Sequence, residues 1–362
     1  MSTAYCYDER CLDHDNGSMI RDPRAGVWLD VPHFERRERL ERTHHVLSEA
    51  QVVKQLDCLP ARQATREELE LVHSPELIEK IKAACALGAP SQVGPQARVG
   101  VDSWEPALAA AGGVLAVTDA VLAGSVENGF ALVRPPGHHA TRDTAMGFCL
   151  FNNVAIAARH AQRRDGIDRI AIIDWDVHHG NGTQAIFYDD PSVLFISLHQ
   201  DNLYPLLSGT LEAPGEGAGE GTTVNIPLPA GVGDAGYVHA FEQVVAPALE
   251  GFAPDLLFVS AGQDPAACDP LGRMSVTTEG FRSLTDRALA QARALCEGRL
   301  VAALEGGYSL EHAPFCNLAV VEALAGLDPA LSGDPIELDV PRRLREFERA
   351  AVAAAASAHA AT

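Results

Sequence analysis

Residues 170–183 read I-A-I-I-D-W-D-V-H-H-G-N-G-T, and they decide the fold and place its chemistry. The β-branched run over residues 170–173 predicts a buried parallel strand. Asp174, Asp176 and His178 follow at every second position, and in extended backbone such side chains share one face. Two carboxylates and an imidazole are costly to bury without a partner. The spacing therefore favours a bound cation over a merely polar loop.

Helices and strands are expected to alternate on both sides of this stretch. Apolar runs predict strands at residues 130–133, 170–173, 193–198, 223–226, 256–260 and 300–304. Amphipathic or apolar patterns predict helices at residues 33–57, 65–73, 75–86, 104–124, 153–164, 237–250, 278–296 and 317–327. This alternation predicts a single-domain α/β fold, an open parallel sheet flanked by helices, with long loops at the carboxyl ends of the strands.

Two boundaries complete the expected organisation. We expect residues 1–330 to form the domain that carries the chemistry, of which residues 1–32 look irregular because glycines and prolines punctuate them. Residues 331–362 form a C-terminal extension that ends in an alanine-rich, low-complexity segment. We expect that segment to be a frayed helix that the fold does not need.

Composition narrows the class of protein. The 362 residues are 47% hydrophobic and 21% charged, which suits a soluble globular protein. A net charge of −21 disfavours nucleic acid and anionic membranes as partners and is compatible with a cationic substrate. We expect no membrane-spanning helix, no secretory signal and a cytoplasmic location, with the eight scattered cysteines as reduced thiols.

Polar residues and glycines follow four of the predicted strands. Sites in such sheets form at the carboxyl ends of the strands. Polar residues at the carboxyl ends of four strands therefore predict one site to which all four contribute. The candidates are His138 and His139 after the first strand, Asp174, Asp176, His178 and Asn181 after the second, Asp264 after the fifth, and Glu305 to Tyr308 after the sixth.

Each group has a chemical role that suits it. Asp176 and His178 supply two metal ligands, and Asp264 is the best third; this donor set suits zinc, iron(II) or cobalt. His138 and His139 are acid/base candidates, with Asp174 and Asn181 available to orient them. A carboxylate partner favours the imidazolium more than an amide does, so the two histidines should differ in basicity. Tyr308 is a neutral donor for a developing oxyanion.

Several motifs resemble those of the histone deacetylase superfamily, closest to class II and the bacterial deacetylase-like amidohydrolases. They are R-P-P-G-H-H, G-F-C-L-F-N-N, D-W-D-V-H-H-G-N-G-T, S-L-H-Q-D, S-A-G-x-D, D-P-L-G-R-M and E-G-G-Y, and the similarity spans about residues 5–330, including H-F-E-R-R-E-R-L. The resemblance implies an arginase-like sheet of eight parallel strands. It also implies a zinc-dependent amidohydrolase that removes acetyl or another short acyl group from an amine, to give acetate and free amine.

The resemblance also assigns roles by matching positions. One zinc ion per chain would be held by Asp176, His178 and Asp264, with His139 as base and then acid, His138 giving electrostatic help and Tyr308 polarising the carbonyl. A structural potassium ion would lie near Asp174, Ser197 and Leu198 and the backbone of Asp176 and His178. The residues expected to line the substrate tunnel are Gly147, Phe148, Leu271 and Gly307.

The substrate end of the site departs from the family pattern. Gln263 stands where an aromatic residue is usual, and Pro265 follows the third ligand. The second tunnel aromatic is expected in residues 201–215, with Tyr204 as one candidate and Leu206 or Leu207 as replacements. Leu271 stands where polyamine-specialised relatives carry an acidic gatekeeper, which favours an acyl-lysine peptide or a small acylated amine.

Three other functions remain as alternatives. They are an acetylpolyamine amidohydrolase, a ureohydrolase with two manganese ions, and a non-hydrolytic module that binds an acylated amine. A homo-oligomer is compatible with the resemblance.

Overall fold

The centre of the molecule is an open sheet in which every strand runs parallel to its neighbours. The computed structural model describes residues 2–20 and 22–359. Within those residues the sheet has eight strands, in the order β2-β1-β5-β10-β9-β6-β7-β8. In that order their bounds are Asp57–Leu59, Thr3–Tyr7, Asn128–Leu132, Leu300–Leu304, Leu256–Ala261, Ile170–Asp174, Val193–Gln200 and Thr223–Leu228. A separate antiparallel pair joins β3 (Ser91–Gly94) to β4 (Ala97–Val99).

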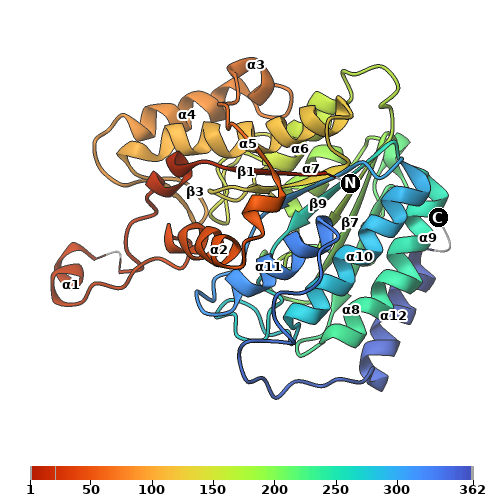
Figure 1. Cartoon of the computed structure of the whole chain (residues 1–362). Helices are drawn as coiled ribbons and strands as arrows, with labels where there is room; N and C mark the ends of the chain where they lie inside the picture. Colours follow the sequence, from red (N-terminus) through yellow and green to blue (C-terminus); the bar gives the residue numbers. More distant parts are fainter. Residues whose placement is uncertain (1, 21, 360–362) are drawn as a thin grey trace.

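Helices cover both faces of this sheet (Figure 1). On one face lie α3 (Arg66–Leu69), α4 (Pro75–Cys85), α5 (Trp104–Leu122), α6 (Asn153–Ala161) and α7 (Asn181–Phe187). On the other lie α2 (Glu38–Glu49), α8 (Asp234–Ala240), α9 (Ala246–Phe252), α10 (Thr278–Leu295), α11 (Ala313–Leu324) and α12 (Glu346–His359). The short α1 (Pro23–Trp28) projects from the body of the molecule.

The opening stretch shows why both faces are apolar. Along β6, Ile170 and Ile172 belong to the core beneath α5 and α6, while Ala171 and Ile173 belong to the core on the opposite face. Side chains alternate along a strand, so a strand buried on both faces needs an unbroken apolar run. The predicted parallel α/β sheet is confirmed.

Helix α5 packs unusually close to its neighbours. A Cβ at Gly112 would lie 1.9 Å from the carbonyl oxygen of Arg62, so only glycine fits there. By length and composition alone, the 22 residues Val101–Leu122 are long and apolar enough to cross a membrane. Of an apolar 18-residue segment within this range, 72% is buried in the protein, as expected for a helix that packs against the sheet.

Some predicted element boundaries were wrong. The helix expected at residues 33–57 is confined to α2, and the one at 237–250 is interrupted by the π-helical segment Phe241–Val245. The last core helix begins earlier, at Ala313. Strand β1 lies in the region that we expected to be irregular. The sequence did not indicate it because it pairs with β5, whose residues lie more than 120 positions away in the sequence.

The C-terminal extension is part of the fold. Helix α12 packs against β8, the edge strand, and its Val352 and Ala355 are fully buried in the main core. Glu348 is also buried and accepts hydrogen bonds from the backbone N–H groups of Gly233 and Arg345. The prediction of a frayed helix is therefore wrong for Glu346–His359, because the alanine-rich composition conceals an apolar stripe that covers the sheet edge. Residues 360–362, the end of the predicted segment, lie outside the described residues.

Candidate active site

The predicted strand ends meet at one edge of the sheet. Strands β10, β9 and β6 are neighbours in the sheet although they lie far apart in the sequence. Their carboxyl ends bring the residues after Leu304, Ala261 and Asp174 together, and the loop after β5 adds the histidine pair. Parallel pairing thus assembles one site from four segments.

Asp176, His178 and Asp264 form a buried cluster that could hold a metal ion. One potential ligand atom from each lies within 4.8 Å of the others. His178 Nδ1 lies 3.0 Å from both Asp176 Oδ1 and Asp264 Oδ2. The other oxygen of each carboxylate accepts a backbone N–H, from Gly306 for Asp176 and from Val177 for Asp264, each at 2.8 Å. Each carboxylate is thereby oriented with one oxygen toward the imidazole.

The negative charge of the two buried carboxylates in this cluster favours the binding of a cation. Burial, together with the nearby charge of Asp176, raises the pKa of the Asp264 carboxyl to about 7. A carboxylate in such surroundings is stabilised by a bound cation more than by water, which burial excludes. Two carboxylate oxygens and one imidazole nitrogen that converge on one point fit a divalent metal ion of the zinc type.

The two histidines have different partners. His138 Nδ1 lies 3.0 Å from Asp174 Oδ2, whereas His139 Nδ1 lies 2.8 Å from the amide oxygen of Asn181. Burial alone would lower the pKa of His138, but the carboxylates of Asp176 and Asp174 raise it well above its usual value. Burial and the positive charges of His138 and His178 lower the pKa of His139 well below its usual value. The expected difference in basicity is present.

Tyr308 is held from two sides. Its backbone N–H donates to Asp269 Oδ2 at 2.6 Å, and the guanidinium of Arg39 lies 4.7 Å from the centre of its ring. Arg39 also donates to the carbonyl oxygens of Gly307 at 2.6 Å and Glu305 at 2.5 Å. These contacts fix the turn that carries the tyrosine.

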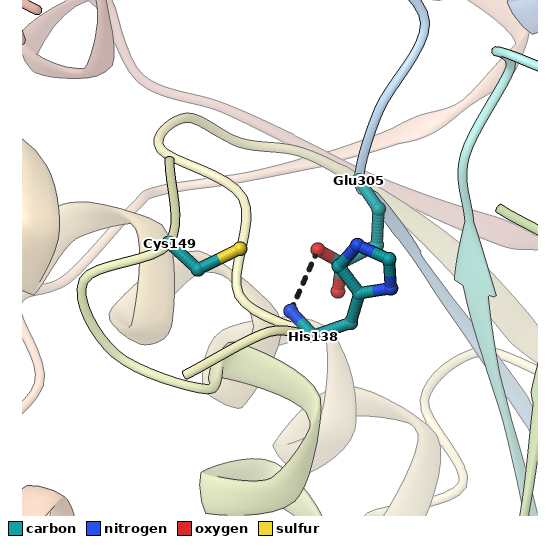
Figure 2. Close-up of side chains that lie close together, drawn as sticks. All are labelled: His138, Cys149 and Glu305. Carbon is teal, nitrogen blue, oxygen red and sulfur yellow. Dashed lines mark hydrogen bonds between the residues drawn. The ribbon is translucent and has the colours of Figure 1, made fainter. Parts of the chain in front are cut away.

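A second buried group lies beneath the histidine pair. Figure 2 shows the carboxylate of Glu305 beside the ring of His138, with the sulfur of Cys149 across the loop. Glu305 Oε2 accepts the backbone N–H of Gly137 at 2.6 Å and that of His138 at 3.1 Å. Burial raises the pKa of Glu305 to about 7 and holds the pKa of the Cys149 thiol well above its usual value. The carboxyl of Glu305 supports the backbone of the histidine loop.

The predicted tunnel residues occupy different depths. Gly147 has φ +54°, and a Cβ there would lie 2.3 Å from His139 Cδ2, so this glycine lines the site directly. The ring of Phe148 meets that of Tyr308 edge-on at 5.9 Å. Gly307 is buried against Gln263. Leu271 is half-buried, and its backbone N–H donates to Asp269.

Tyr204 is the aromatic residue that the loop after β7 contributes to the site. Its ring centre lies 4.9 Å from that of His139 and 6.4 Å from that of His178. Leu206 and Leu207, the alternatives to Tyr204, are 75% and 87% exposed. Of the three candidates, Tyr204 is therefore the one that the structure places in the wall of the site.

The roles of Asp269, Arg39 and Glu305 could not be predicted from the sequence. Each lies in a quoted motif, D-P-L-G-R-M, H-F-E-R-R-E-R-L or E-G-G-Y, which was the available signal. All three act on backbone groups of other loops, and a sequence pattern does not display such contacts.

Comparison with known proteins agrees with this geometry. The family model described as the histone deacetylase domain matches residues 33–324. The chain belongs to the histone deacetylase family. It is an enzyme of that family, a deacetylase that hydrolyses acyl amides.

Individual histone deacetylase relatives cover most of the chain. A histone deacetylase-like amidohydrolase from Pseudomonas aeruginosa is 42% identical over 355 residues, which is 96% of this chain and 93% of that protein. The human polyamine deacetylase HDAC10 is 44% identical over 320 residues, or 85% of this chain and 47% of the human protein. The crystal structure of the HDA15 HD domain superposes with a TM-score of 0.88 at 37% identity, covering 99% of this chain and 94% of that one. The deacetylase fold implied by the motifs is confirmed.

Proposed function

We propose that the enzyme removes an acetyl or other short acyl group from an acyl-lysine-like side chain or a small acylated amine, using one zinc ion per chain. The observation that carries the proposal is the convergence of Asp176, His178 and Asp264 beside a histidine pair with unlike partners. The histone deacetylase family is zinc-dependent, which supports zinc over iron(II) or cobalt.

The metal site would be made by His178 Nδ1 and one oxygen from each of Asp176 and Asp264. When bound there, zinc would supply Lewis-acid polarisation of the amide carbonyl and lower the pKa of a water molecule. The backbone bonds from Gly306 and Val177 pre-orient the two carboxylates, so little reorganisation is needed on binding.

The histidines divide the proton chemistry. In our proposal the Nδ1–H of His139 donates to Asn181, which leaves Nε2 as the acceptor of a proton from the attacking water. His139 then returns that proton to the leaving amine as the C–N bond breaks, and the hydroxyl of water stays on the acyl carbon as the carboxylic acid. His138, paired with Asp174, remains charged and stabilises the developing negative charge.

Tyr308 would hold the carbonyl oxygen. Burial, the largest cause, raises the pKa of its phenol well above the usual value, so its O–H remains a donor at neutral pH. A positioned neutral donor stabilises an oxyanion without being ionised itself.

Four further features belong to the proposal. A structural potassium ion would be held near Asp174, Ser197 and Leu198, with backbone oxygens of Asp176 and His178; Ser197 is buried beside Asp174 in the β6–β7 register. A catalytic unit within residues 1–330, a cytoplasmic location and a homo-oligomer are also proposed.

An acetylpolyamine amidohydrolase is the second candidate. The identity to the human polyamine deacetylase and the net charge of −21 favour it, because polyamines are cations. Leu271 stands where polyamine-specialised relatives carry an acidic gatekeeper, and this difference favours the acyl-lysine-like substrate.

The test is acetate release from an acetyl-lysine peptide and an acetylated polyamine, by metal-free and zinc-reloaded protein. We expect release only after reloading, loss of bound zinc in Asp264→Ala, and retained zinc with about 10²–10³-fold lower kcat in Tyr308→Phe. Asp201→Ala, at an exposed carboxylate, serves as the control. Absence of chelator-sensitive release from every amide tested would refute the proposal.

A further inference from the structure

The loop that carries Tyr204 also holds two leucines out into solvent. Residues 204–209 read Y-P-L-L-S-G, and the backbone N–H of Ser208 donates to the carbonyl of Pro205 at 3.3 Å. This bond closes a β-turn with Leu206 and Leu207 at its two central positions. Their exposed fractions, 75% and 87%, are among the highest of the large apolar side chains in the part of the chain that the structure describes.

Leu207 occupies an unfavourable backbone conformation. Its φ is +63°, in the left-handed region. Glycine or asparagine is the ordinary residue at a turn position with positive φ, since a Cβ there clashes with the backbone. A leucine at this position adds strain and an exposed apolar surface while contributing little to the core. Such strain is kept where it serves function.

The base of the turn is fixed rather than free. Ser208 Oγ lies 3.0 Å from Nδ1 of the buried His179, and the carbonyl oxygen of Gly209 lies 2.9 Å from Nε2 of the buried His199. Leu203 and Leu211, on either side, pack against the main core. The backbone that carries Leu206 and Leu207 is therefore held in one position by the residues on either side of the turn.

The turn directly follows, in the chain, a residue that lies in the active site. Tyr204 immediately precedes the turn, and its ring lies against His139. The acyl group enters toward the metal and the histidines, so the amine portion of a substrate extends outward past Tyr204. We propose that Leu206 and Leu207 form a docking surface for an apolar group on the amine portion of the substrate, such as a leucine or phenylalanine side chain beside an acyl-lysine.

This inference rests on the proposed function and narrows its substrate class. An apolar group would be partly removed from water against the leucines, which is favourable. A polyamine offers further ammonium groups instead, and these gain nothing from aliphatic side chains. The surface thus selects acylated lysine in an apolar sequence over acetylpolyamines.

The experiment compares two acetyl-lysine peptides that differ only in a leucine or a serine next to the acetylated residue, with an acetylated polyamine as a third substrate. For the zinc-loaded enzyme we expect kcat/KM to be about tenfold higher for the leucine peptide. In Leu206→Ser and Leu207→Gly this ratio should fall toward one. Because glycine relieves the positive φ, Leu207→Gly should unfold at the same or a higher temperature, so loss of the preference is not loss of the fold.

Leu87→Ser is the matched control, since Leu87 is 71% exposed just beyond the end of α4 and should leave the ratio unchanged. Equal rates on the two peptides, or a preference for the polyamine that both variants retain, would overturn the inference while leaving the deacetylase proposal intact. A change of oligomeric state on light scattering with an unchanged peptide ratio would assign the leucines to an interface between copies and also overturn it. No chelator-sensitive release from any substrate would instead overturn the proposed function itself.

Discussion

Replacing Asp269 should separate the position of Tyr308 from the integrity of the metal site. The Asp269 carboxylate is buried and accepts three backbone N–H groups, those of Leu271 at 2.8 Å, Tyr308 at 2.6 Å and Ser309 at 3.2 Å. It therefore ties the loop that carries Leu271 to the turn that carries Tyr308. Asp269→Ala removes all three acceptors at once.

The size of the effect follows from those bonds. Each buried N–H left without an acceptor costs about 1–3 kcal/mol, and partial relaxation of two loops brings the total loss of unfolding free energy to about 3 kcal/mol. A misplaced Tyr308 would lose its proposed contact with the substrate carbonyl oxygen, and loss of one such donor lowers kcat by about 10²–10³-fold. KM should change little, because the rest of the substrate contacts remain. Asp269→Asn keeps one acceptor oxygen and should show roughly half of the stability loss.

The assay is urea unfolding followed by steady-state kinetics and metal analysis on the same zinc-loaded preparations. Asp201→Ala provides the control for removal of an exposed carboxylate. A kcat within about threefold of the unmodified enzyme would refute the positioning argument. Loss of zinc from Asp269→Ala would show instead that Asp269 supports the metal site.

Three further predictions test other parts of the structure. Val352→Asp places a charge in the core beneath α12 and should lower the unfolding free energy by more than about 3 kcal/mol in urea melts. Ala353→Asp, at an exposed position of the same helix, should change it little. Equal effects of the two substitutions would contradict the packing of this helix. Burial lowers the pKa of His73 to about 4, below its unfolded value of about 6.5, so its contribution to stability is lost as pH falls through that window. Between pH 6.5 and 5 this amounts to about 2 kcal/mol, and His73→Gln should remove that part of the pH dependence of urea unfolding; an unchanged slope would refute it. Gly147→Ala should abolish deacetylation while the metal is retained, because the added Cβ would clash with the ring of His139 and because residue 147 has a positive φ. Normal turnover would show that the loop can move to accommodate the methyl group.

Much of this structure could be predicted because its determinants are local in the sequence. The apolar run at residues 170–173 defines β6, and the alternation of Asp174, Asp176 and His178 defines one face of its end. Strand β1 could not be predicted in this way, since its pairing with β5 depends on a partner far along the chain. Asp269 was missed for a related reason: it acts on backbone N–H groups, which every residue except proline possesses. Helix α12 was misjudged because Val352 and Ala355 form an apolar stripe too narrow to stand out in alanine-rich sequence.

The strand order has a consequence for how the enzyme matures. Strand β9, which leads to Asp264, pairs with β6 on one side and β10 on the other, so Asp176 and Asp264 come together only when β6 and β9 have paired. A chain interrupted before residue 264 would lack one of the three proposed zinc ligands, and one interrupted before residue 308 would lack Tyr308. Binding of the proposed zinc ion would thus be coupled to completion of the fold, because its three ligands are dispersed in the unfolded chain. Under the proposed function, the order of synthesis, from β6 through β9 to β10, would withhold hydrolytic activity from a chain that has not yet reached Tyr308.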